Sequence, residues 1–240
     1  MSPAVMAGAV ERERVRLDSL ERSEADFKLG VAAQRRGHLD AAAEAYAKAV
    51  ERDPSFVEAM VNLARVRAAE GRFDQADEWL DRASLVRDDY PDIAAARGLV
   101  ALGRGDAKLA VSELTRARVV EPDDVEVLIN LGAALIEAGL WLEAIGHLDR
   151  AARLDTTRSA AVLNLALAHD HRGDAARAAF HYRRYLDLVS PGDPEREAVE
   201  ARLERLAGRV PHAVKAKAPP EEASEGNTPP DINPTRTAGR

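Results

Sequence analysis

Residues 125–158 read VEVLINLGAALIEAGLWLEAIGHLDRAARLDTTR, and the same pattern of small and large residues recurs before and after this stretch. The most regular feature of the pattern is a glycine that returns every 34 residues without insertion, at Gly37, Gly71, Gly105, Gly139 and Gly173. A fixed period of this length is typical of proteins built from stacked structural repeats. The sequence therefore predicts five repeats, at residues 23–56, 57–90, 91–124, 125–158 and 159–192.

Each repeat is predicted to form two helices. In the quoted stretch, Leu128 and Leu131 lie three residues apart before the recurring glycine, and Ala144 and Leu148 lie four residues apart after it. This spacing places apolar residues on one face of a helix. The glycine between the two segments fits the end of the first helix, because glycine adopts the left-handed conformation there without steric cost. One helix pair cannot bury both of its apolar faces, so neighbouring repeats must stack.

Other columns of the repeat alternate small and large residues, as close helix packing requires. One column is alanine throughout: Ala42, Ala76, Ala110, Ala144 and Ala178. A second column holds only glycine or alanine: Gly30, Ala64, Gly98, Gly132 and Ala166. A third column carries large side chains: Tyr46, Leu80, Leu114, Leu148 and Tyr182.

These columns resemble the tetratricopeptide repeat, whose 34-residue signature runs Trp-x2-Leu-Gly-x2-Tyr, then Ala-x3-Phe, then Pro. The leucine before the small residue is present in four repeats, as Leu29, Leu63, Leu131 and Leu165. The tryptophan column departs from the family and holds Asp26, Met60, Ala94, Leu128 and Val162. The resemblance implies an all-α, right-handed α-solenoid whose function is not fixed by the fold.

Three segments lie outside the repeats. Residues 1–22 contain alternating Glu and Arg, and we expect residues 10–22 to form a helix that covers the first repeat. Residues 193–210 are predicted to form a capping helix, with Asp193 as its cap, Pro194 in its first position and Glu195 in its first turn. Residues 211–240 are rich in Pro and charge and poor in apolar residues, so we expect a disordered tail.

Composition narrows the classes of partner and compartment. The chain has 34 basic and 41 acidic residues and a net charge of -7, which disfavours a nucleic-acid partner. The apolar segment at residues 4–10 is short, contains Gly8 and lacks a basic stretch before it, so it predicts neither a secretory signal nor a membrane span. We expect a cytoplasmic protein, although a periplasmic protein cut from its signal would look the same. The absence of cysteine excludes disulfides and thiolate metal sites.

The resemblance also implies where a ligand binds, because the first helices of such repeats line a concave groove. The candidate groove residues are Phe27, Val31, Val61, Asn62, Arg65, Ala95, Leu99, Leu102, Ile129, Asn130, Ala133, Ile136, Leu163, Asn164 and Leu167. Most are apolar, and a contiguous exposed apolar surface usually marks a partner site. The alternative is that these side chains only widen the core. The three Asn residues are equally suited to bonding a ligand backbone or to satisfying neighbouring helix ends.

Charges near this groove have two interpretations. Four first helices carry an acid in their first turn: Glu24, Glu58, Asp92 and Glu126. Such acids stabilise the helix dipole wherever they occur. Together with Glu137 and Asp170 they would also make an acidic rim suited to a segment with basic flanks. The Lys and Asn pattern with which some repeats of this family clamp a terminal carboxylate is absent, because only Asn62 matches it.

No pattern in the sequence predicts catalysis. His169 and His171 are two residues apart and so do not share a helix face, which disfavours a metal site. His169 is expected to pack in the core. The chain has no phosphate-binding glycine loop, nucleophile elbow or paired His-Glu zinc motif. We therefore predict a protein that is not an enzyme and needs no cofactor.

Two arginines occupy columns that are mostly apolar or small elsewhere. Arg67 and Arg97 lie at the junction of the second and third repeats. Either their stems cover apolar surface while the charged heads reach water, or they meet buried acids and make a weak, flexible joint.

The predicted function is a scaffold or adaptor that binds a peptide or amphipathic helix of a partner protein in the groove. One alternative is an assembly factor for a bacterial envelope machine, such as a pilus or secretion apparatus, by analogy of fold alone. Another is an accessory subunit that presents substrates to an enzyme. Self-association through an exposed end of the solenoid is a further possibility.

Overall fold

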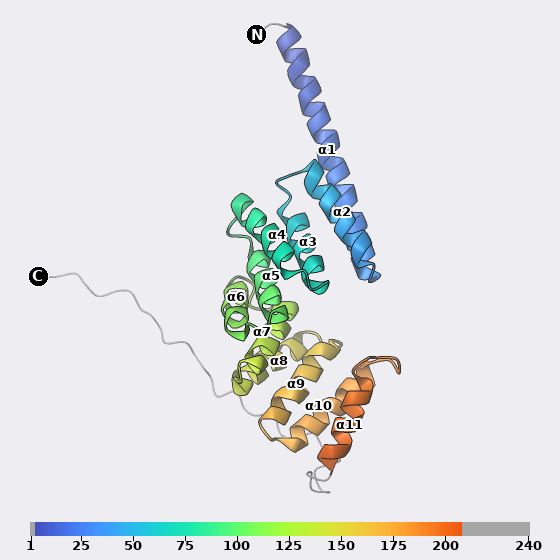
Figure 1. Cartoon of the computed structure of the whole chain (residues 1–240), viewed down its shortest axis with the longest axis vertical. Coiled ribbons are helices and arrows are strands. Elements are labelled where there is room, and N and C mark those ends of the chain that lie inside the picture. Colours follow the sequence, from blue (N-terminus) through green and yellow to red (C-terminus); the bar gives the residue numbers. More distant parts are fainter. Residues whose placement is uncertain (1–2, 208–240) are drawn as a thin grey trace, which may run out of the picture.

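The computed structural model describes residues 3–207, and this part of the chain is helical, with no strand. The helices are α1 (Pro3–Arg35), α2 (Leu39–Arg52), α3 (Val57–Ala69), α4 (Phe73–Val86), α5 (Pro91–Gly103), α6 (Ala107–Val120), α7 (Val125–Glu137), α8 (Trp141–Leu154), α9 (Ser159–His171), α10 (Ala175–Leu188) and α11 (Arg196–Ala207). They follow one another along the long axis of the molecule (Figure 1).

The helix boundaries repeat with the period of the sequence. The helices α3, α5, α7 and α9 begin at residues 57, 91, 125 and 159, which are 34 residues apart. Each of these first helices contacts the second helix that follows it, and α3 contacts α5, α5 contacts α7, and α7 contacts α9. Stacking of adjacent helix pairs builds a solenoid, so the predicted all-α fold class is confirmed.

The recurring glycines end the first helices as predicted. All five have positive φ angles, from 74° at Gly71 to 81° at Gly173. At the end of α3, the Gly71 amide donates to the Ala68 carbonyl at 2.9 Å, and the Arg72 amide donates to the Arg67 carbonyl at 2.8 Å. This pair of bonds satisfies helix-end carbonyls and requires a left-handed residue between them.

The columns of small residues let the two helices of a pair approach closely. A Cβ atom built on Gly132 of α7 would lie 2.4 Å from Cγ of Leu148 on α8. The column of five alanines is fully buried, at 0% exposure in each repeat. Leu114 and Leu148 are also at 0% exposure, so large side chains from second helices fill the space that the small residues leave. The core is therefore a continuous strip between successive helix pairs.

The N-terminal segment is helical, as expected for residues 10–22. Residues 3–22 continue without a break into the first helix of the first predicted repeat, so that α1 is 33 residues long. Its N-terminal half extends beyond the other helices (Figure 1), and Val10 and Val15 are 69% and 61% exposed. Contact with α2 begins near Ser19, whose hydroxyl donates to the Arg52 carbonyl at 3.0 Å. The segment therefore prolongs the first helix instead of covering it.

The helix after the last predicted repeat begins three residues later than expected. Asp193 precedes α11 and accepts hydrogen bonds from the Glu195 amide at 3.0 Å and from the Tyr185 hydroxyl at 2.5 Å. Val199 and Leu206 are buried in a cluster that also contains Tyr185. Thus α11 closes the last apolar face of the solenoid. The expected tail at residues 211–240, and the last three residues of the expected capping helix, lie outside the described residues.

The two arginines at the second junction behave differently. Arg97 reaches the exposed carboxylate of Asp81 at 2.8 Å and the Ser84 hydroxyl at 3.1 Å. Arg67 instead pairs at 2.8 Å with Glu70, whose side chain is only 13% exposed. The guanidinium of Arg97 therefore lies near the surface, whereas the guanidinium of Arg67 pairs with a largely buried carboxylate.

None of the helices in the described part of the chain is long and apolar enough to cross a membrane.

Candidate functional site

The candidate groove residues separate into a buried group and a partly exposed group. Val61, Ala95 and Ile129 are 1%, 8% and 4% exposed and belong to the apolar core, so they have little surface left for a ligand. The remaining candidates keep part of their surface accessible. They are Phe27, Val31, Asn62, Arg65, Leu99, Leu102, Asn130, Ala133, Ile136, Leu163, Asn164 and Leu167.

Six of these candidates form what we call the first-helix surface, on α5, α7 and α9. It consists of Leu99, Leu102, Ala133, Ile136, Leu163 and Leu167, all partly exposed. Leu102 and Ile136 also pack against the central core cluster, and Leu163 and Leu167 pack against the C-terminal cluster. These side chains therefore support the core with one side and face outward with the other.

At the N-terminal end, the candidates are engaged in aromatic packing. The Phe27 ring lies 5.6 Å from the ring of Tyr46 and 4.9 Å from the ring of Phe56, measured between centroids. The Tyr46 hydroxyl donates to Gln34 at 2.7 Å. This end is filled by its own side chains, so the apolar surface open to a ligand lies toward α5, α7 and α9.

The three Asn candidates lie on α3, α7 and α9. Asn62, Asn130 and Asn164 are partly exposed, and their side-chain amides make no hydrogen bond within residues 3–207. They do not satisfy the neighbouring helix ends there, which leaves both donors and the acceptor of each amide available to a ligand.

The first-turn acids are paired with bases, one from the neighbouring repeat and the others from the same repeat. Arg65 donates to Asp92 at 2.7 Å, and Arg158 donates to Glu126. Glu58 lies 4.0 Å from Arg87. These pairs neutralise most of the charge expected for an acidic rim, and exposed pairs of this kind contribute little to stability.

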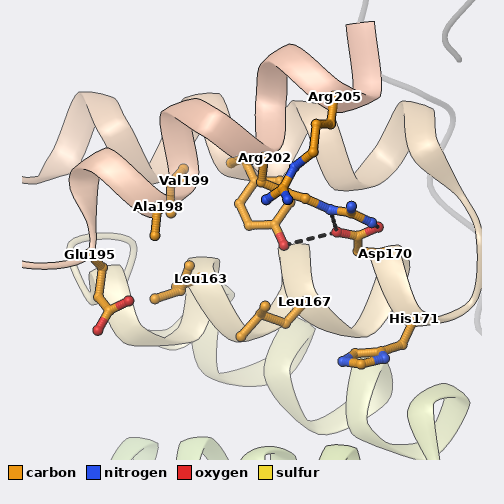
Figure 2. A pocket seen from close by; sticks show the side chains of 10 residues that line it. Leu163, Leu167, Asp170, His171, Glu195, Ala198, Val199, Arg202 and Arg205 are labelled. Atoms are coloured by element: carbon orange, nitrogen blue, oxygen red, sulfur yellow. Dashed lines mark hydrogen bonds and ion pairs between the residues drawn. The ribbon is translucent and has the colours of Figure 1, made fainter. Parts of the chain in front are cut away.

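A pocket of about 390 Å³ lies between α9, α10 and α11, and we call it the C-terminal pocket. Four of its lining residues belong to α9 and one belongs to α10. The others lie on α11 or, in the case of Glu195, just before it (Figure 2). These residues are Leu163, Leu167, Asp170, His171, Tyr182, Glu195, Ala198, Val199, Arg202 and Arg205. The first-helix surface continues into it through Leu163 and Leu167. The contribution of α11 was not predicted from the sequence.

A carboxylate network holds one side of this pocket together. Arg202 donates two hydrogen bonds to Asp170, both at 2.5 Å, and the Tyr182 hydroxyl donates to the same carboxylate at 3.1 Å. Burial alone would raise the pKa of Asp170, but the bonds and charge of Arg202 hold that pKa below its usual value. Burial, followed by the Asp170 charge, raises the pKa of Tyr182. Asp170 is thus a fixed anion that ties α11 to α9.

The histidines of the last helix pair pack against each other. His169 is 4% exposed, as expected, and its ring stacks on His181 with 5.4 Å between centroids. Burial lowers the pKa of His181 to about 4, with a smaller contribution from His169, so this imidazole is neutral at pH 7. Within residues 3–207 there is no group of three His, Cys, Asp or Glu residues that could hold a metal ion.

Comparison with known proteins gives matches to repeat proteins of one kind. Models of the tetratricopeptide repeat match residues 33–100 and residues 95–159, which together make up more than half of the chain. A curated relative, cellulose synthase 1 operon protein C of Komagataeibacter xylinus, is 27% identical over 225 residues. That match covers 86% of this chain but only 17% of the relative.

Solved structures with the same fold share little sequence with this chain. PilW, described as a widely conserved type IV pilus biogenesis factor, is 18% identical with a TM-score of 0.68, over 78% of this chain and 86% of its own. PilF of Pseudomonas aeruginosa is 21% identical with a TM-score of 0.65, over 80% and 86%. YrrB, described as a repeat protein with an unusual peptide-binding site, is 18% identical with a TM-score of 0.55, over 82% and 97%. At these identities the likeness concerns the fold.

Proposed function

Because the chain belongs to the tetratricopeptide repeat family, we propose that it is a non-catalytic scaffold that binds a peptide or amphipathic helix of a partner protein on the first-helix surface. The observation that carries the proposal is the line of partly exposed aliphatic side chains on three successive first helices, from Leu99 to Leu167. Such a line gives the apolar side chains of a bound segment a place to bury their surface.

Two further features support a ligand on this surface. Asn130 lies three residues before Ala133, and Asn164 lies three residues before Leu167, so each shares a helix face with a member of the first-helix surface. The amides of both Asn residues have no partner within residues 3–207. An extended segment needs donors and acceptors for its own backbone, and side-chain amides supply both. The candidate site thus combines apolar contact with polar groups that fix orientation, as protein-binding surfaces commonly do.

The proposal is tested by affinity capture from the organism that makes the chain. The Leu99→Glu, Ile136→Glu double variant places charges on the surface and is expected to lose partners that the wild type retains. A matched control, Leu85→Glu with Val119→Glu, adds the same charges to α4 and α6 at side chains that are 88% and 72% exposed. The control is expected to keep those partners.

Ile136 also touches the core, so each variant is first compared with the wild type by thermal melting in circular dichroism. If the double variant is unfolded, the single Leu99→Glu variant provides the same test. If a folded variant still captures the partners, or if the control loses them equally, the partners do not bind the first-helix surface.

A second candidate function is assembly of an envelope machine. It is favoured by the names of the relatives, since PilW is described as a pilus biogenesis factor and the curated relative is a protein of a cellulose synthase operon. A substrate-presenting subunit of an enzyme is the remaining alternative. Partners identified in the capture experiment separate these functions, because the first predicts structural proteins of the envelope and the other predicts an enzyme. Cell fractionation tests the predicted cytoplasmic location.

A further inference from the structure

The segment that contains α11 continues the 34-residue register of the repeats, although α11 itself begins at Arg196, just after Glu195. Two of the interface columns change character in this segment. Glu195 lies 34 residues after Ala161, and Arg202 lies 34 residues after Ala168. In the first helices α3, α5, α7 and α9, both columns are apolar and buried. The column that reaches Glu195 holds Ala59, Ile93, Val127 and Ala161, and the column that reaches Arg202 holds Val66, Val100, Ala134 and Ala168.

This change explains why a pocket exists at this junction. Side chains such as Val100 and Val127 fill the space between successive first helices, at 2% and 5% exposure. Glu195 is exposed, and Arg202 extends to Asp170 instead of filling the space beside Leu163 and Leu167 (Figure 2). The space left open, about 390 Å³, falls within the range of ligand-binding pockets.

The charges of the C-terminal pocket are unequal at its two ends. Arg202 is neutralised by Asp170 in the bidentate pair. Arg205 also extends from α11 toward the pocket, but its guanidinium makes no ion pair with residues 3–207 (Figure 2). Glu195 lies at the opposite end, beyond Leu163. An aliphatic floor therefore leads to a cation whose donors are free for a carboxylate.

We propose that the C-terminal pocket binds an extended partner segment that carries an aliphatic residue and, two residues before or after it, Asp or Glu. The aliphatic side chain contacts Leu163, Leu167 and Val199, and the carboxylate pairs with Arg205. In an extended chain, side chains two residues apart point to the same side, so both groups enter one pocket. The side chains of adjacent residues point to opposite sides, so they could not both enter the pocket. The inference rests on the proposed function and gives the partner a chemical signature.

The test uses the full chain and a phage-displayed library of random heptapeptides. Enriched peptides are expected to share an aliphatic residue with Asp or Glu two positions before or after it. The best of them is synthesised with a C-terminal amide, so that no terminal carboxylate contributes, and its Kd is measured by fluorescence anisotropy. Because the paired carboxylate forms charge-assisted bonds, Arg205→Glu is expected to raise the Kd about tenfold or more.

Two controls separate the pocket from general charge effects. Arg183→Glu changes an exposed arginine of α10 that does not line the pocket, and it is expected to leave the Kd unchanged. A peptide with Lys in place of the acid is expected to bind Arg205→Glu more tightly than it binds the wild type. Arg183 and Arg205 are both exposed, so neither variant should unfold, and circular dichroism is used to check that both are folded.

Several outcomes overturn the proposal. They are the absence of enriched peptides, enriched peptides without the acid, equal affinity of the Arg205→Glu variant, or binding that only a free terminal carboxylate restores. If Arg205→Glu and the wild type have the same Kd, but partner capture still depends on Leu99 and Ile136, only the pocket proposal is wrong. If the Leu99→Glu, Ile136→Glu variant captures the same partners as the wild type, the proposed function is wrong instead.

Discussion

Single residues set the distance between helices in this molecule. Gly132 allows Leu148 to approach the backbone of α7, whereas Gly146 of α8 has no atom within 4 Å of the Cβ position. The same residue type therefore has two different roles. The recurring Gly and Ala columns made the close approach predictable from the sequence, because the first-helix position that faces the large side chain of the second helix is always glycine or alanine.

Substitution of these two glycines by alanine should have opposite effects. Gly132→Ala forces a methyl group into Leu148 and is expected to destabilise the fold by about 1–3 kcal/mol. Gly146→Ala meets nothing and lowers the entropy of the unfolded chain, so it should stabilise by roughly 0.5–1 kcal/mol. Urea unfolding followed by circular dichroism measures both. Equal shifts of the same sign would contradict the packing described for Gly132.

The buried His181 imidazole gives the fold a dependence on pH. Its pKa in the fold is lowered to about 4, so between the ordinary value near 6.5 and pH 4 the unfolded chain binds a proton that the folded chain does not. Stability is therefore lost as pH falls through this window. Relative to the His181→Leu variant, the wild type should lose roughly 1–3 kcal/mol of unfolding free energy between pH 7 and pH 4. A constant difference across the window would show that His181 does not titrate in this way.

At the scale of helices, the ion pairs of α3 and α5 differ in how deeply their acids are buried. Asp81, the partner of Arg97, is 73% exposed, whereas Glu70, the partner of Arg67, is 13% exposed. Sequence alone placed both arginines in apolar columns but could not separate them, because the burial of the partner acid depends on the packing of the neighbouring helices.

The two arginines should therefore differ in their contribution to stability. Arg67→Leu leaves the Glu70 carboxylate largely buried with only Arg72 nearby, and it is expected to cost about 1–3 kcal/mol. Arg97→Leu removes a pair with an exposed carboxylate and should change stability by no more than about 1 kcal/mol. Thermal melts of the two variants test the difference. A larger loss for Arg97→Leu would contradict it.

The attachment of α11 depends on Asp170, which bonds both Arg202 and Tyr182. Asp170→Asn is expected to weaken that attachment by about 1.5–3 kcal/mol, the usual contribution of hydrogen bonds to a charged group. Hydrogen exchange should show faster exchange in α11 and little change in α5. Asp187→Asn, at an exposed carboxylate of α10, is the matched control and should leave exchange unchanged. Unchanged exchange in both variants would exclude Asp170 as the tie.

At the scale of the whole molecule, stability is a sum of contributions from neighbouring helix pairs. This additivity is why the period alone predicted the solenoid. The period did not predict the long α1, because the repeat frame suggested a boundary near Ser23 although no Pro or Gly interrupts the helix there. Nor did it predict the C-terminal pocket, which required the observation that α11 stays in register while Glu195 and Arg202 replace apolar residues.

The exposed N-terminal half of α1 should be dispensable for folding. Met6, Val10 and Leu17 are 57%, 69% and 52% exposed, and the hydrogen bond from Ser19 to the Arg52 carbonyl of α2 lies beyond this half of the helix. Removal of residues 1–17 is therefore expected to change the free energy of unfolding by no more than about 0.5 kcal/mol, as for surface changes in general. Circular dichroism melts provide the measurement. A large loss would reveal that this half of the helix contributes to the stability of the solenoid.

Site-specific photo-crosslinking shows directly whether partners bind the first-helix surface. A photoreactive phenylalanine is placed in turn at Leu102, at Leu167 and, as the control, at Leu85 on α4, and the chains are irradiated in the cells that make them. The account predicts covalent adducts with one partner protein from Leu102 and Leu167 and none with that partner from Leu85. Adducts from Leu85 alone, or equally from all three positions, would contradict it.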